Sequence, residues 1–328
     1  MSSPQFRDFK YSHLFKDKSV TKGIADELKC PFLKPCAAAF EANFLRMETF
    51  SFLPAYVAFE VRRNQVIACN GVYETLKRPV LWGDFISDSR PNVGGYLREK
   101  YAEYQGLSTE VKTTLLQTLG LNYVVEHLNE EQHSSSPTEK PKIGTLGGSV
   151  DAVFSGVIMF SWTIFECLAT DLWIALINDG PKEWASRVIN SGELQKAEPD
   201  ARAIYELEYD PRKHFGEYLV ETGRLSFQKL SSIKTAYRIA FGKESSDLFE
   251  DTADGYVKAL SSVRNILIHK NGLVDKKFVG EVGRFPELKN YAVKDTIVLD
   301  GEITHKLSYA AGTVGCALLR YADKLMAT

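Results

Sequence analysis

The segment "SSVRNILIHKNG", residues 261–272, places Arg264, Asn265 and His269 in an otherwise apolar run. Histidine titrates near neutral pH, so its imidazole can accept or donate a proton. Arginine keeps its positive charge, and its fork of N–H donors fits a phosphate oxygen. The asparagine amide can orient the imidazole or hydrogen-bond the same phosphate. These three residue types could therefore move a proton at a phosphodiester while holding its charge.

Ordinary helix capping is the competing interpretation of this segment. Cations in a last helical turn interact favourably with the helix macrodipole by about 0.3–1 kcal/mol, which accounts for His269 and Lys270. The pair Asn271-Gly272 is suitable C-cap chemistry. Capping explains Arg264 poorly because that residue lies nearly two turns from the helix end. It also leaves Asn265, a weak helix former, unexplained in mid-helix.

The spacing from arginine to histidine is by itself weak evidence. With fifteen arginines and six histidines, about one such match is expected by chance. A second match, Arg7…His13, lies at the N-terminus without helical periodicity and is set aside. The match at Arg264 differs from it because helical elements surround it.

Apolar residues around Arg264 predict an amphipathic helix from roughly Asp251 to Asn271. Their three- and four-residue steps form one stripe of Val257, Leu260, Val263, Ile266 and Leu267. Asn265 and His269 are four residues apart and share a face, and the long side chain of Arg264 can reach the same edge. Gly272 is expected to end the helix in the left-handed conformation.

Helical periodicity dominates the rest of the chain, which predicts a mainly α fold. Residues 132–149, "QHSSSPTEKPKIGTLGGS", lack an apolar period and predict a linker. It would separate a helical N-terminal domain of unknown role, residues 1–131, from a C-terminal domain, residues 150–328. Within the latter, residues 295–304, "DTIVLDGEIT", alternate like a short β-hairpin with Asp300-Gly301 as its turn. A last helix is expected from about His305 to Met326.

Residues 150–178 predict one long and strongly apolar helix. It is long enough to span a bilayer, but Glu166 and Asp171 would each cost roughly 2.5–3.5 kcal/mol at mid-membrane. We therefore interpret it as a core helix whose large aromatic residues, Trp162, Phe165 and Trp173, are buried.

Composition and charge indicate a soluble, cytoplasmic protein. The 328 residues are 44% hydrophobic and 25% charged, which suffices for a sizeable core. A formal net charge of −2 gives no global positive field, so any phosphate-binding surface must be a local patch. Five cysteines without a CxxC pair predict free thiols in a reducing compartment, and the spacing of histidines and cysteines indicates no metal site.

The run "VRNILIHKNGLVD", residues 263–275, resembles the signature of the HEPN superfamily, which is an arginine, a polar residue, three to five further residues and a histidine. Asparagine directly after arginine, and Asn-Gly before an apolar-Val-Asp run, resemble the nuclease branch. The order of expected elements also fits: a long helix bearing acidic residues, an amphipathic helix, the motif helix and a closing helix. The resemblance covers about residues 150–328.

The resemblance implies an antiparallel helical bundle that dimerises through its motif helices and cleaves RNA without a metal or cofactor. In that reaction the RNA 2′-OH attacks the adjacent phosphorus, leaving 2′,3′-cyclic phosphate and 5′-OH ends. Arg264, Asn265 and His269 would be the catalytic residues, and a two-fold dimer would supply the second histidine for acid–base catalysis. A related branch has a modified tyrosine at the position of Asn271, so that arrangement is not expected here.

Two further residues have a role implied by the resemblance. Glu166, on the long helix, is the acidic residue expected to approach and support the motif, although a surface or structural carboxylate is the alternative. Lys270 could contact RNA phosphate or simply lie solvated at the helix end. A toxin or antiviral-defence effector, with a regulatory or antitoxin partner, is the role that such nucleases commonly serve.

Two other functions remain open from the sequence. One is a non-catalytic HEPN-like protein that dimerises and binds RNA or a nucleotide. The other is a plain helical-bundle interaction protein in which the motif is a cap. Loss of toxicity on changing His269 would favour the nuclease over both.

Overall fold

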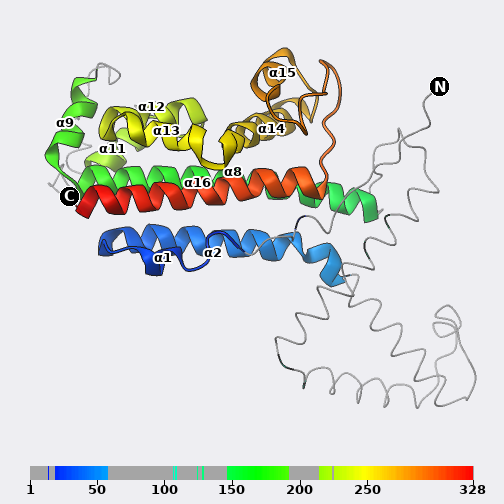
Figure 1. Ribbon diagram of the computed structural model, residues 1–328, viewed down its shortest axis with the longest axis horizontal. Helices are drawn as coiled ribbons and strands as arrows, with labels where there is room; N and C mark the ends of the chain where they lie inside the picture. Colours follow the sequence, from blue (N-terminus) through cyan, green and yellow to red (C-terminus); the bar gives the residue numbers. More distant parts are fainter. Residues whose placement is uncertain are drawn as a thin grey trace, which may run out of the picture. The chain divides into compact units, whose positions relative to one another are not determined.

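The computed structural model describes residues 14, 19–57, 106, 108, 124, 128, 146–191, 214–223 and 225–327. The chain divides into two compact units, residues 1–12 with 51–152 and residues 13–50 with 153–328. Nearly all of the described residues belong to the second unit. This unit is mainly helical, as the sequence predicts, and the described residues contain no β-strand (Figure 1).

The helices are α1 (Ile24–Glu27), α2 (Lys34–Ser51), α8 (Leu146–Asp179), α9 (Lys182–Asn190), α11 (Phe215–Glu221), α12 (Leu230–Phe241), α13 (Lys243–Asp251), α14 (Tyr256–Lys270), α15 (Lys276–Val282) and α16 (Gly301–Ala327). Two short 3-10 helices, η2 (Pro31–Leu33) and η4 (Thr252–Gly255), precede α2 and α14. In Figure 1, α12, α13 and α14 lie on one side of the long helix α16. The motif helix is therefore held between α16 and its neighbours α13 and α15.

Helix α8 is the centre of the core. Trp162 is 1% exposed and Phe165 and Trp173 are fully buried, which confirms the interpretation of these three residues as core. Trp173 Nε1–H donates to the carbonyl of Ala236 on α12 at 3.3 Å. Within the described residues, α8 is the one helix with the length and apolar character to cross a membrane, and 56% of its apolar window is buried inside the protein.

Helix α2 packs on α16 and α8 through small residues of α16. A side-chain Cβ at Gly315 would lie 2.2 Å from the ring of Phe40 and 2.9 Å from Leu168, so only glycine allows this approach. A Cβ at Gly312 would lie 2.4 Å from the Val20 side chain and 3.3 Å from the ring of Phe44. This contact joins an N-terminal helix to the C-terminal core.

The division of the chain predicted from the sequence differs from the observed packing. The sequence predicts one N-terminal domain over residues 1–131, yet residues 13–50 share a compact unit with 153–328. The apolar side chains of α2 are buried against both α16 and α8, which accounts for the difference. The predicted linker, 132–149, also ends earlier than expected because α8 begins at Leu146.

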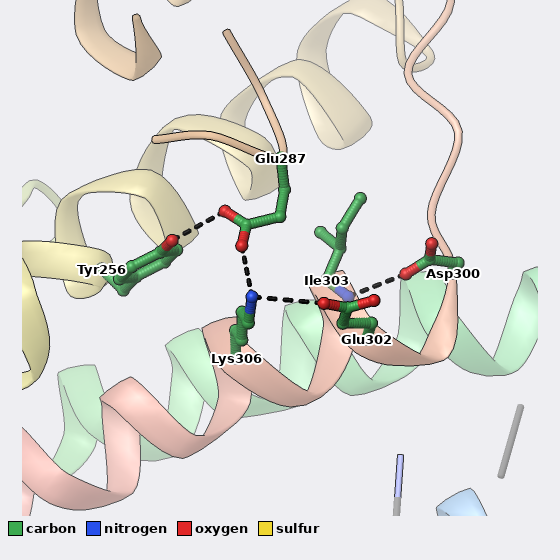
Figure 2. Close-up of polar contacts among 6 residues, drawn as sticks. All are labelled: Tyr256, Glu287, Asp300, Glu302, Ile303 and Lys306. Carbon is green, nitrogen blue, oxygen red and sulfur yellow. Dashed lines mark hydrogen bonds and ion pairs between the residues drawn. The ribbon is translucent and has the colours of Figure 1, made fainter. Parts of the chain in front are cut away.

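The hairpin predicted for residues 295–304 is not formed. The Asp300 carboxylate accepts a hydrogen bond from the backbone N–H of Ile303 at 2.8 Å, so Asp300-Gly301 begins α16 instead of making a turn (Figure 2). Thr296 forms an isolated antiparallel bridge with Leu273, directly after α14. Asp is favoured both in hairpin turns and at helix N-caps, which is why the pattern is misleading.

A polar cluster fixes the start of α14 against α16 (Figure 2). The Tyr256 hydroxyl donates to Glu287 Oε2 at 2.7 Å, and Lys306 Nζ donates both to Glu287 and, at 3.3 Å, to Glu302. Burial alone would raise the pKa of Glu287, but the hydrogen bonds from Lys306 and Tyr256 lower it below its ordinary value of 4.5. The cluster therefore favours an ionised Glu287 and orients the motif helix.

We expect Glu287→Gln to lower the free energy of unfolding by about 1 kcal/mol or less at pH 7, and by a smaller amount near pH 3. A carboxyl whose pKa is lowered by folding stabilises the protein at pH values above its pKa in the unfolded chain. This stabilisation is lost as the pH falls through its pKa in the folded protein. Urea unfolding of both proteins at the two pH values measures the difference. Glu183→Gln on α9 is the control, and an equal difference at both pH values would contradict the assignment.

Candidate functional site

Helix α14 carries the motif and runs from Tyr256 to Lys270, so it ends as predicted but begins about five residues later than predicted, after the 3-10 helix η4. Four residues of the predicted stripe, Val257, Leu260, Val263 and Ile266, are buried. Two consecutive residues in the left-handed conformation, Asn271 at φ 50° and Gly272 at φ 76°, end the helix. The N–H of Gly272 donates to the carbonyl of Ile266 at 2.9 Å, which closes the last turn. The capping chemistry expected from the sequence is therefore present.

Capping nevertheless leaves the motif side chains facing an open groove. Arg264 and Asn265 are half-buried, whereas His269 is exposed in the last turn. Arg264 Nη1–H donates to Asn265 Oδ1 at 3.1 Å, so these two side chains are held together. All three side chains line the same groove, which has a volume of about 960 Å³. The structure thus brings the three predicted residues to one surface.

The groove lies between α12, α13, α14 and α15 and is strongly cationic. Eight Lys or Arg residues and four Asp or Glu residues line it, which gives a net charge of +4 with histidine neutral. Helices α14 and α15 contribute four of the cations, which are Lys258, Arg264, Lys270 and Lys277. The whole chain has a formal net charge of −2, so the groove is a local positive patch of the kind a phosphate-binding surface requires.

The other four groove cations are not singled out by the sequence pattern. They lie on α12 and α13 and in the residue before α12, and they are Lys229, Lys234, Arg238 and Lys243. Lys234 and Arg238 are four residues apart on α12, which places them on one face of that helix. This spacing is a signal that the sequence contains, but it does not say that the face lies opposite the motif.

Glu166 lies on α8, and its carboxylate Oε2 accepts a hydrogen bond from Trp162 Nε1–H at 2.7 Å. Burial raises the pKa of Glu166, while this hydrogen bond and the positive charge of Arg264 act in the opposite direction. Glu166 is therefore close enough to Arg264 to interact with it electrostatically. Asp171, the other acidic candidate on α8, is exposed, and burial alone raises its pKa. Of these two carboxylates only Glu166 interacts with the charge of Arg264, which limits the rise in its pKa that burial causes, and neither of them lines the groove.

Lys270, the last residue of α14, is exposed and lines the groove. Its carbonyl accepts a hydrogen bond from the N–H of Leu273 at 2.9 Å. The backbone of Lys270 therefore takes part in ending the helix while its side chain is available to the groove.

The other sequence predictions about chemistry concern thiols and metals. Four of the cysteines, Cys30, Cys36, Cys167 and Cys316, are free thiols, and Cys69 lies outside the described residues. In the described ranges, no three or more His, Cys, Asp and Glu side chains are grouped so that they could hold a metal ion.

Comparisons with models of known protein families, with curated proteins and with solved structures found no match to this chain. The likeness to HEPN nucleases therefore rests on the motif residues and on their helical setting.

Proposed function

We propose that this protein is a metal-independent endoribonuclease of HEPN type, which cleaves RNA to 2′,3′-cyclic phosphate and 5′-OH ends. The observation that carries the proposal is the cationic groove that Arg264, Asn265 and His269 line together. A phosphodiester in this groove would meet positive charge, amide donors and an imidazole within one site. A cytoplasmic toxin or antiviral-defence effector, controlled by a regulatory or antitoxin partner, is the role that the family resemblance suggests.

The chemistry assigns a role to each side chain. His269 accepts the proton of the attacking 2′-OH or donates one to the departing 5′ oxygen. Arg264 binds a nonbridging oxygen and stabilises the negative charge that develops on the phosphorane. Asn265, already hydrogen-bonded to Arg264, holds the guanidinium in place or donates its N–H to the phosphate. The proton balance is complete because one proton leaves the 2′-OH and one reaches the 5′ oxygen.

One imidazole can serve as the base while a second serves as the acid, and we propose that a homodimer formed through α14 supplies the two. Ile268 and Leu273, on either side of His269 in the chain, are each 46% exposed. A second copy of the chain packed over this end of α14 would remove both apolar side chains from water, which favours association. This observation supports an interface next to His269.

Glu166 is proposed as a positioning residue that acts through Arg264. Glu166→Gln should lower kcat by roughly threefold to fivefold, the size of effect expected for a charge interaction partly screened by solvent, with KM unchanged. Glutamine can still accept the Trp162 hydrogen bond but carries no charge, so the substitution isolates the interaction with Arg264. Steady-state cleavage of a labelled RNA measures kcat and KM separately. Asp171→Asn is the matched control, and an effect on KM alone would contradict the positioning role.

Incubation of the purified protein with RNA in excess EDTA tests the proposal as a whole. Cleavage that persists, with 2′,3′-cyclic phosphate on the upstream product, is the expected result. Cleavage that chelation abolishes would overturn the metal-independent mechanism. RNA binding without any product would instead favour the non-catalytic alternative.

A further inference from the structure

One wall of the groove holds exposed cations that the proposed chemistry does not use. Lys229, Arg238 and Lys243, here called the α12–α13 wall, are all exposed. Within the described part of the chain, no carboxylate lies within 4.0 Å of their charged groups. Their charge is therefore not neutralised by the protein's own acids in these segments. Such cations can exchange counterions for the phosphates of a ligand.

Lys234, on the same helix face as Arg238, is by contrast neutralised within the protein. Its Nζ lies 2.5 Å from Glu250 Oε1, and Arg284 Nη2 lies 3.3 Å from Glu250 Oε2. The hydrogen bond from Lys234 is the main cause that lowers the pKa of Glu250, and the charges of Lys234, Arg284 and Lys258 add to it. The Glu250 carboxylate thus lies among three cations, Lys234, Lys258 and Arg284, in an environment that would also bind a phosphate.

The groove has few side chains on which a nucleotide base could stack. Among its lining residues Phe278 is the single Phe, Tyr or Trp, and it is 1% exposed, so the one aromatic ring that the groove presents is the imidazole of His269. Proteins that select bases on single strands do so through exposed aromatic platforms and contacts to base edges. Lys258 and Lys270 mark a path of about 18 Å along α14, at 1.5 Å per residue. The groove therefore suits the backbone of a short single strand.

We propose that the α12–α13 wall binds the phosphates of a single RNA strand beside the scissile bond, and that Glu250 competes with the RNA for Lys234. This inference rests on the proposed function because it takes RNA as the ligand. Recognition at this wall is through backbone charge and is tolerant of sequence. In the free protein, Glu250 neutralises the charge of Lys234, and a bound RNA phosphate would replace Glu250 as the partner of Lys234.

The test measures RNA binding in the His269→Ala full-length protein, so that cleavage does not interfere. Fluorescence anisotropy with labelled oligo(U) and oligo(A) of about 12 nucleotides gives Kd over a range of salt concentrations. The triple variant Lys229→Gln/Arg238→Gln/Lys243→Gln should weaken binding at least tenfold near 0.15 M salt and reduce the salt slope by about 2. The two RNA sequences should bind within about threefold of each other.

A matched triple variant outside the groove controls for the change in net charge. Lys34, Lys289 and Lys324 are exposed and do not line the groove, so changing all three to Gln should alter Kd by less than about twofold. Equal Kd values for the wall variant and this control would overturn the proposal. A difference of more than tenfold between oligo(U) and oligo(A) would overturn sequence-tolerant binding.

Glu250→Gln should change the affinity for RNA in the opposite direction from the wall variant. Releasing Lys234 and removing a negative charge should tighten RNA binding by about threefold to tenfold, whereas Glu221→Gln, on α11 outside the groove, should not. Thermal unfolding checks that each variant is folded. If the folded Glu250→Gln protein binds RNA as the parent does or more weakly, Glu250 does not compete with RNA for Lys234.

Failure of this inference is distinguishable from failure of the proposed function. If the wild-type protein cleaves RNA but the wall variants bind as their parent does, the nuclease assignment stands and the wall assignment falls. If binding depends on the α12–α13 wall but the wild-type protein yields no product, the wall assignment stands and the nuclease assignment falls.

Discussion

His269→Ala is expected to lower kcat for RNA cleavage by about 10²–10⁴-fold, the range that general acid–base catalysis by histidine contributes. The side chain is exposed in the last turn of α14, so the free energy of unfolding should change by no more than about 0.5 kcal/mol. Single-turnover cleavage of an end-labelled RNA in EDTA measures the loss. A loss of rate without a loss of stability would separate chemistry from folding.

His214→Ala is the matched control for this variant. His214 lies directly before α11, and it does not line the groove. Cleavage by this control should equal that of the wild-type protein. A His269→Ala protein that cleaves at the wild-type rate would place the chemistry elsewhere and leave α14 with a capping role alone.

Arg264→Ala should lower kcat by about 10²–10³-fold because it removes the charge that stabilises the phosphorane. Arg264→Lys keeps the charge but loses the fork that holds Asn265, so it should recover only part of the rate, to within about tenfold of the wild type. The same single-turnover assay, with a urea titration of each variant, measures both effects.

Arg320→Ala, which removes an exposed arginine paired with Glu27 outside the groove, controls for the loss of a guanidinium. If Arg264→Ala retains the wild-type kcat and raises only KM, the guanidinium binds substrate and transition state equally, and its proposed stabilising role is wrong. Full activity of Arg264→Lys would show that the fork geometry is unimportant.

The elements that carry the motif are predictable because local physics determines them. The three- and four-residue steps from Val257 to Ile266 make one face of α14 apolar, and that face is buried. Asn271 and Gly272 tolerate positive φ, so the helix ends where the sequence indicates. Trp162 and Trp173 are too large and apolar for any position but the core of this helical unit.

Other features are not predictable because they depend on tertiary partners. Periodicity shows that α2 has an apolar face, but not that Gly315 on α16 leaves room for Phe40. The compact units therefore divide the N-terminal residues differently from the predicted domains, with residues 13–50 grouped with 153–328. Asp300 can initiate a turn or cap a helix, and the choice depends on whether residues 295–297 pair with a hairpin partner or with the segment after α14.

The candidate site is predictable only along α14. Arg264, Asn265 and His269 can be placed together because one helix carries them. The cations of α12 cannot be assigned to the site from the sequence, because a lysine or arginine on an amphipathic helix is usually solvated. Only the packing of α12 and α13 beside α14 places Lys234 and Arg238 opposite the motif and makes a groove.

In the proposed reaction His269 helps a ribose 2′-OH in this groove to attack its own phosphodiester. A DNA strand with a single ribonucleotide tests it most directly, in EDTA, with the wild-type and His269→Ala proteins side by side. The account predicts one cut by the wild type, after the ribonucleotide, with a 2′,3′-cyclic phosphate, and at least about a hundredfold less product from His269→Ala. Cutting of an all-DNA strand, or equal cutting by the two proteins, would contradict it.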